Sequence, residues 1–269
     1  MQFRQKALSK LQSPEELDLP VRFARPRGWL VLAVTLCAMA GATFWAVTGT
    51  VVSKVTAPGI LTHAEGSYIL QSPVSGQVTA ILAREGESVP KDAPLLNVRT
   101  GDGQTRAVRA VAAGRVTSLV AKIGSVVTTG SDVATVERVG SPGDPLIAML
   151  YVPGSSGASI SPGADVDLKV QSAPSQQFGV LLGKVKAVGR APQTRQQITG
   201  FLGDAQLGEQ FSEDGKPMAV LVELKRSKDT KSGYAWSQDD GPPFELESTS
   251  LVDADIHQSE EHPIDWLLP

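Results

Sequence analysis

The chain has 269 residues, a formal net charge of −3 at pH 7, and 26 glycines and 18 prolines against 5% aromatic residues. This length allows one or two compact domains in addition to any membrane segment. The charge is close to neutral and gives no support for nucleic-acid binding. Cys37 is the only cysteine, which excludes a disulfide framework and a thiolate metal cluster within the chain.

An apolar segment follows the polar and basic residues 1–27 that begin the sequence. The run from Trp29 to Val47 is uncharged, and with its flanks it reaches the roughly 20 residues that a transmembrane helix needs. Trp29 and Trp45 lie near its two ends, where transmembrane helices carry aromatic anchors. A cleaved signal peptide would have a shorter apolar core nearer the N-terminus. We therefore expect a transmembrane helix over 28–48.

The distribution of basic residues predicts how this helix crosses the membrane. Arg22, Arg25 and Arg27 precede the apolar run, whereas only Lys54 follows it closely. Basic residues next to a span collect on its cytoplasmic side. The N-terminus is thus expected in the cytoplasm and the bulk of the chain outside it, with Arg25 and Arg27 joining the two tryptophans as candidate membrane anchors.

The sequence between Gln71 and Val136 contains one motif twice. Gly76 and Gly114 mark the same position in the two copies, which are therefore 114 − 76 = 38 residues apart. The half-motifs span 71–98 and 109–136. Further identities at this offset, without a gap, pair Val78 with Val116, Thr79 with Thr117, Gly86 with Gly124, Val89 with Val127 and Val98 with Val136. A fixed period of this kind indicates a duplicated structural unit.

Each copy predicts a short strand between two turns, because residues 78–82 and 116–120 alternate as half-buried strands do. Gly76 and Gly114 precede these strands, where we expect either a positive φ in a tight turn or a close approach of two backbones.

The second glycine pair, Gly86 and Gly124, follows the strands and predicts the next turns. Two such units can close on each other as a small flattened barrel over 71–138. The alternative is two unrelated hairpins with ordinary turn glycines, which the ungapped register disfavours.

The remaining sequence also predicts mostly strands. Residues 49–70 contain one or two strands, broken at a Pro-Gly pair, that lead from the membrane to the first half-motif. The segment 145–226 has about four alternating strands, enough for a second small β-barrel, and a weakly helical stretch over Gln193–Phe211. Residues 227–269 form a C-terminal membrane-proximal segment with a last strand over Val252–Ile256.

The duplicated motif resembles the lipoyl or biotinyl fold, in which two half-motifs form a sandwich. Carrier domains of that fold present a modified lysine where the halves join, but the joining segment Arg99–Arg106 has no lysine. The motif is also similar to that of the HlyD-type membrane fusion proteins, the periplasmic adaptors of export pumps. Those proteins usually insert a long helical hairpin at this joint. This chain has a short polar loop instead, with its tip at Gly101, Asp102 and Gly103.

Segments outside the duplicated motif narrow the resemblance. They are Ser13-Pro-Glu-Glu-Leu-Asp18 before the span, Arg27-Gly-Trp29 and Phe44-Trp45 at its ends, and Pro263-Ile-Asp-Trp-Leu-Leu-Pro269 at the end of the chain. Together they resemble the secretion proteins of nitrile-hydratase-leader (NHLM) bacteriocin export systems, a short HlyD-type branch. We would expect a glycine turn before the last strand, but Glu247–Ser250 contains no glycine, which leaves the pairing of that strand open.

This resemblance implies a mainly β fold: a single N-terminal transmembrane helix, a lipoyl-like barrel-sandwich hybrid, a second small β-barrel domain and no long helical hairpin. It implies a non-enzymatic adaptor without a cofactor, anchored in the bacterial inner membrane with its bulk in the periplasm. The expected partners are a peptidase-containing ABC transporter, the exported peptide, membrane lipid and further copies of the chain. An alternative of another class is a membrane-tethered lipoyl-like carrier or ligand-binding module.

No constellation of residues in the sequence supports catalysis or metal binding. The three histidines, His63, His257 and His262, are scattered, and none has a partner at metal-ligand spacing. The many serines include no Gly-x-Ser-x-Gly nucleophile elbow. A membrane-bound hydrolase in the second β-region therefore lacks a nucleophile constellation.

The predicted topology can be measured with enzyme fusions in cells. Alkaline phosphatase folds to its active form outside the cytoplasm, so a fusion after Val136 should be active and a fusion after Pro20 inactive. The reverse pattern of activities would contradict the orientation.

Overall fold

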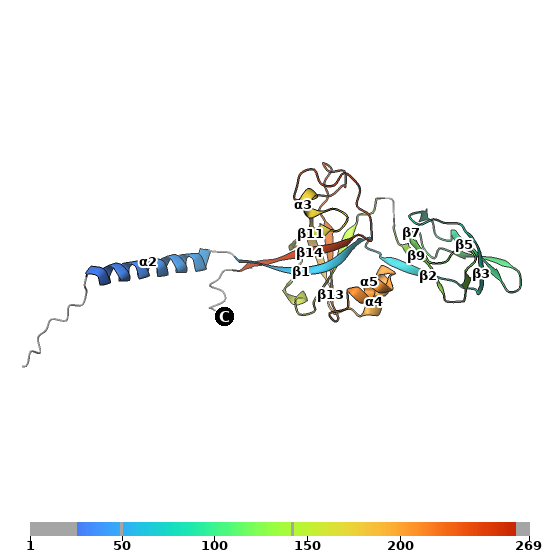
Figure 1. The fold of residues 1–269 in the computed structure, drawn as a ribbon, viewed down its shortest axis with the longest axis horizontal. Helices are drawn as coiled ribbons and strands as arrows, with labels where there is room; N and C mark the ends of the chain where they lie inside the picture. Colours follow the sequence, from blue (N-terminus) through green and yellow to red (C-terminus); the bar gives the residue numbers. More distant parts are fainter. Residues whose placement is uncertain (1–25, 49–50, 141–142, 262–269) are drawn as a thin grey trace, which may run out of the picture. The chain divides into compact units, whose positions relative to one another are not determined.

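The structure, a computed structural model, describes residues 26–48, 51–140 and 143–261 (Figure 1). The motifs predicted at Ser13–Asp18 and Pro263–Pro269, and the candidate anchor Arg25, lie outside the described residues. The chain divides into two units, one that contains the N-terminal helix and one that spans 52–260.

The described part of the N-terminal unit contains helix α2 (Pro26–Thr48), which includes the predicted span. Its segment Gly28–Thr48 is long and apolar enough to cross a membrane. Three of its threonine hydroxyls donate to the carbonyl oxygen four residues earlier, as Thr35 does to Val31 at 2.8 Å. Polar groups that are satisfied within the helix are compatible with a hydrocarbon environment. Trp29 and Trp45 are both exposed near the helix ends.

Two four-stranded antiparallel sheets form the domain built from the duplicated motif (Figure 1). In order across the first sheet, the strands are β2 (Ser67–Gln71), β9 (Asp132–Glu137), β7 (Gly114–Leu119) and β4 (Ser88–Val89). The second sheet contains β6 (Thr105–Arg109), β5 (Pro94–Thr100), β3 (Gly76–Ile81) and β8 (Val126–Val127).

Every strand of one sheet has a counterpart in the other at the offset of 38 residues, so this lipoyl-like domain has an internal two-fold pseudo-symmetry. Its core comes equally from both copies. The paired valines Val78 and Val116, and Val98 and Val136, are all fully or almost fully buried. Each copy of the sequence motif therefore forms one half of the lipoyl-like domain and contributes the same residues to its core.

A closed six-stranded barrel forms the second domain. Its strands, in order, are β1 (Val51–Thr62), β10 (Ile147–Val152), β13 (Met218–Leu224), β12 (Leu181–Val188), β11 (Asp165–Val170) and β14 (Leu251–Glu261). The short helices in its loops are η1 (Gly157–Ser159), α3 (Ser175–Phe178), α4 (Arg195–Leu202) and α5 (Ala205–Gln210). Closure removes the free sheet edges that would otherwise invite pairing with other chains.

The barrel corrects the division of the chain drawn from the sequence. The segments 49–70 and 227–269 are not separate from the second domain, because β1 and β14 are barrel strands and complete a sheet of six rather than about four. The Pro-Gly pair does not break β1. A Cβ on Gly59 would lie 2.5 Å from the carbonyl oxygen of Met149 on β10, so glycine lets the two strands approach.

The outer face of β10 is covered as well as its inner face, so all six of its residues are buried. Ala148, Leu150 and Val152 belong to the barrel core. Ile147, Met149 and Tyr151 instead pack in a second cluster with residues of α4 and of the chain after α5. Within this cluster the rings of Tyr151 and Phe211 stack with centroids 4.7 Å apart. The two helices therefore form a covering layer on one side of the barrel.

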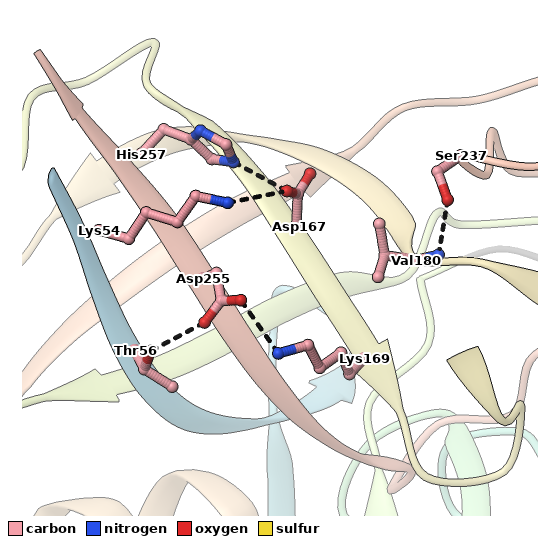
Figure 2. A network of polar contacts seen from close by, with 8 residues as sticks. All are labelled: Lys54, Thr56, Asp167, Lys169, Val180, Ser237, Asp255 and His257. Atoms are coloured by element: carbon pink, nitrogen blue, oxygen red, sulfur yellow. Dashed lines mark hydrogen bonds and ion pairs between the residues drawn. The ribbon is translucent and has the colours of Figure 1, made fainter. Parts of the chain in front are cut away.

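The last strand is joined to its neighbours by polar side chains on the outside of the barrel (Figure 2). Asp255 on β14 accepts a hydrogen bond from Thr56 of β1 at 2.8 Å and pairs with Lys169 of β11 at 3.0 Å. Two residues further along β14, His257 lies 2.8 Å from Asp167 of β11. Exposed pairs of this kind contribute at most about 1 kcal/mol each, so they specify the register of β14 more than they stabilise the barrel.

The four repeated glycines fall into two types. Gly86 and Gly124 have φ of +83° and +89° in the turns after the strands, a conformation that glycine adopts at low cost. Gly76 and Gly114 do not have positive φ and are the first residues of β3 and β7. A Cβ on either one would overlap a backbone carbonyl oxygen, that of Arg99 or of Glu137 respectively. Their role in this structure is thus close backbone approach.

We predict that Gly76→Val and Gly114→Val each destabilise the protein by about 1–3 kcal/mol, as overpacked sites do. The measurement is protease resistance and thermal unfolding of the purified chain. Gly101→Ala is the matched control, because Gly101 has open space around it and no positive φ. Valine variants as stable as this control would contradict the close approach.

Candidate functional site

The joint between the two half-motifs is a tight hairpin turn. β5 ends at Thr100 and β6 begins at Thr105, so only four residues separate the strands. The amide of Thr100 donates to the carbonyl of Gln104 at 2.9 Å, and the amide of Gly103 donates to the carbonyl of Thr100 at 2.9 Å. Gly103 adopts φ of +79° to complete the turn. In the loop expected over Arg99–Arg106, only the residues 101–104 lie outside the strands.

The carboxylate of Asp102 forms hydrogen bonds within this turn. It accepts hydrogen bonds from the hydroxyl of Thr100 and from the amide of Gln104. The Thr100 hydroxyl holds the pKa of Asp102 below its ordinary value, with a further contribution from the Gln104 amide. Gly101 and Gly103 flank this carboxylate and are exposed. The turn carries no lysine, so the position that a carrier domain would modify is absent here.

A buried carboxylate lies at the opposite, pseudo-symmetric end of the lipoyl-like domain. Glu137, the last residue of β9, is 0% exposed. One of its oxygens accepts hydrogen bonds from the hydroxyl of Thr62 at 3.0 Å and from the amide of His63 at 3.1 Å. The same oxygen lies 2.9 Å from Nδ1 of the His63 ring. Glu137 therefore connects the lipoyl-like domain to the end of barrel strand β1.

The electrostatics of this contact favour the ionised carboxylate. Burial alone would raise the pKa of Glu137, but hydrogen bonds from His63 and Ser248 outweigh burial and place the pKa below its ordinary value. A carboxyl whose pKa is lowered by folding contributes stability above its unfolded pKa of about 4.3 and loses this contribution as pH falls through the folded pKa. The junction is therefore stabilised at neutral pH and weakened only in strongly acidic solution.

A second contact joins the two domains beside Glu137. Thr135, two residues earlier on the same face of β9, donates to the carbonyl of Gly203 at 3.2 Å. Gly203 ends α4 in a left-handed conformation, and a Cβ there would meet Thr135 and Ser67. The adjoining Gly66 similarly leaves room for the ring of Phe201. We call this contact, made by Gly66, Ser67, Thr135, Phe201 and Gly203, the α4 pad.

The pseudo-symmetry identifies the residues at the tip end of the lipoyl-like domain that are equivalent to those of the junction. At the offset of 38 residues, Thr135 and Glu137 correspond to Asn97 and Arg99 on β5. Ser67, which is 7% exposed, corresponds to the exposed Thr105. The barrel covers one end of the lipoyl-like domain, whereas the equivalent residues around Arg99 and the tip remain open.

The turn before β14 contributes to the covered end. Ser248 in this turn contributes to the lowered pKa of Glu137, and the next residue, Thr249, has φ of +67°. A β-branched residue in the left-handed region costs roughly 1–2 kcal/mol. Its amide donates to the carbonyl of Leu61 at 2.7 Å, and the amide of Leu61 donates to the carbonyl of Ser250 at 2.9 Å. The glycine expected over Glu247–Ser250 is thus replaced by a strained threonine, and β14 pairs with β11 nevertheless.

The fold can be compared with known proteins on this basis. No family model matches the chain. The crystal structure of ZneB from Cupriavidus metallidurans is 11% identical, with 78% of this chain and 100% of that chain covered and a TM-score of 0.51. The structure of MacA from Actinobacillus actinomycetemcomitans is also 11% identical, with 80% and 81% of the two chains covered and a TM-score of 0.51. Both are membrane fusion proteins, or periplasmic adaptors.

The chain has the adaptor fold. Its mainly β architecture, with one apolar N-terminal helix, a lipoyl-like sandwich and a β-barrel, matches that of these two structures. The adaptor fold here has its half-motifs joined by a four-residue turn, so the tip of the lipoyl-like domain is the turn itself.

Sequence reasoning identified the tip and missed the junction. Gly101, Asp102 and Gly103 lie together at the turn, whereas Glu137 carries no motif and lies at the end of a predicted strand. One signal was available. The buried valines repeat at the 38-residue offset, but Arg99 and Glu137 have opposite charge, which indicates that the two ends of the repeat have different surroundings.

Proposed function

We propose that this chain is a non-enzymatic adaptor, anchored in the inner membrane with its N-terminus in the cytoplasm and its bulk in the periplasm. In this role it assists the export of a leader-bearing, bacteriocin-type peptide by a peptidase-containing ABC transporter. The observation that supports this most directly is that one chain combines the adaptor fold with a helix able to span a membrane. The motifs at the chain's ends, which resemble those of NHLM secretion proteins, support the choice of transporter and cargo.

The geometry of the tip limits what the adaptor can reach. Four residues between β5 and β6 form a closed turn, and even fully extended they would span at most about 14 Å. Such a turn cannot bridge a periplasm many times wider. We therefore infer that the tip contacts the exported peptide, a further copy of the chain or another periplasmic adaptor, and does not itself dock an outer-membrane channel.

A carrier function remains the alternative, because carrier domains share the lipoyl-like sandwich. It would require a modified lysine, and the turn Gly101–Gln104 contains none. An intact mass that equals the mass of the unmodified chain would remove this alternative.

Photo-crosslinking in intact cells tests the proposed function at two positions. A crosslinking residue at Leu36, which is 60% exposed on α2, should form adducts with an ABC transporter that carries a peptidase domain. One at Gln104, which leaves the Asp102 contacts in place, should form adducts with the exported peptide, a copy of the chain or another periplasmic adaptor. Lys228, exposed on a barrel loop, is the control position for the tip.

The outcomes separate the two parts of the proposal. A dominant adduct between Gln104 and an outer-membrane channel would overturn the limited reach. The absence of a transporter adduct from Leu36, when the protein is in the membrane, would contradict the role in ABC-driven export.

A further inference from the structure

The two contacts at the domain junction differ in what separation would cost. The α4 pad includes the ring of Phe201 and closely packed backbone at Gly66 and Gly203, and separating it would expose apolar surface. The Glu137 contact is made of a carboxylate, a hydroxyl and an imidazole. These groups are well hydrated in water. Release of the Glu137 carboxylate therefore restores much of the hydration free energy that it lost on burial.

The Glu137 contact also depends on several groups converging at one point. Thr62 and His63, at the end of β1, both donate to one oxygen of the Glu137 carboxylate, whereas its other oxygen is buried without a hydrogen-bond partner. Removing any one of them leaves a buried charge with fewer donors, which is costly inside a protein. The contact is thus stable when complete and weak when partly formed.

Backbone strain lies next to this contact. Thr249 follows Ser248 and is held at φ of +67° by hydrogen bonds around Leu61. Strained residues persist where their surroundings fix them, and they gather in segments that change conformation. Movement of this turn would relieve the strain beside the contact.

Space for movement adjoins the contact. A cleft of about 740 Å³ is lined by residues of both domains, among them Val89 and Arg115 of the lipoyl-like domain and Leu146 and Tyr234 of the barrel domain. His63 also lines it, and Ser248 does too. The residues that hold Glu137 therefore border open space on one side.

We propose that Glu137 is a releasable latch: when its contact opens, the lipoyl-like domain pivots on the α4 pad and the tip changes direction relative to the barrel. This latch goes beyond the proposed export function. It sets the orientation of the open end of the lipoyl-like domain, and it does so for any partner that this end contacts. Thr62 and His63 are positioning residues for the latch.

Distance measurements between spin labels test the latch in the full chain, purified in lipid nanodiscs. Labels at Gln104→Cys and Lys228→Cys, in a Cys37→Ser background, report the separation of the tip from the barrel. The wild-type junction should give one narrow distance distribution. Glu137→Ala should at least double its width, and Glu137→Gln should broaden it less because the amide oxygen still accepts hydrogen bonds.

Two variants serve as controls. Arg99→Gln changes the pseudo-symmetric counterpart of Glu137 at the open end, and it should leave the distribution narrow. Thr249→Gly removes the strain while keeping the hydrogen bonds of the turn, so it should keep the latch closed and the distribution as narrow as wild type.

A barrel-side variant keeps the test decisive if the Glu137 variants do not fold. Thr62→Val removes one donor from the carboxylate and should also broaden the distribution. The latch is overturned if every folded variant at Glu137 and Thr62 keeps the wild-type width, or if Arg99→Gln broadens it as much as they do.

Discussion

The buried carboxylate of Glu137 is the interaction on which the arrangement of the lipoyl-like domain and the barrel depends. It is fully removed from solvent and is held by donors from Thr62 and His63 at the end of β1. A buried charge without partners would be strongly destabilising, so β9 and the end of β1 must be in place together. The same residue ends the last strand of the duplicated motif, so the contact converts a symmetric domain into one with a bound end and an open end.

This asymmetry gives the two copies of a duplicated motif different surroundings. Two equivalent halves pack on one core, but their equivalent ends lie in different surroundings. Thr135 and Glu137 meet the barrel, whereas Asn97 and Arg99 are left beside the tip turn. The fold thereby offers one surface for attachment to the barrel domain and a related surface that stays open for contact with a partner.

Much of this fold follows from local patterns in the sequence. The 38-residue offset predicts the lipoyl-like domain because each half buries the same valines, and the uncharged run after residue 27 predicts α2. The turn at Asp102 is likewise local, since its hydrogen bonds join residues within four positions of one another. These features depend on neighbours in the sequence or on an exact repeat, and a sequence displays both.

The features that escaped prediction depend on contacts between distant segments. The burial of both faces of β10 requires α4 and α5, which lie about fifty residues further along, and alternation alone cannot show a covering helix. Inclusion of β1 and β14 in the barrel requires pairing between the two ends of the chain. Thr249 adopts a conformation normally left to glycine because Leu61 and Ser250 hold it there, and no local pattern indicates that.

Amide hydrogen exchange at two equivalent positions measures the central asymmetry most directly. The amide of Arg138 donates to the carbonyl of Gly66 at 2.8 Å, and its counterpart at Thr100 donates to Gln104 at 2.9 Å. Since the two hydrogen bonds are equivalent, a difference in amide protection measures how much less often the latched end opens than the open end. After correction for intrinsic rates, the account predicts at least about tenfold slower exchange at Arg138, and loss of this difference in Glu137→Ala. Equal protection of the two amides in the wild-type chain would contradict it.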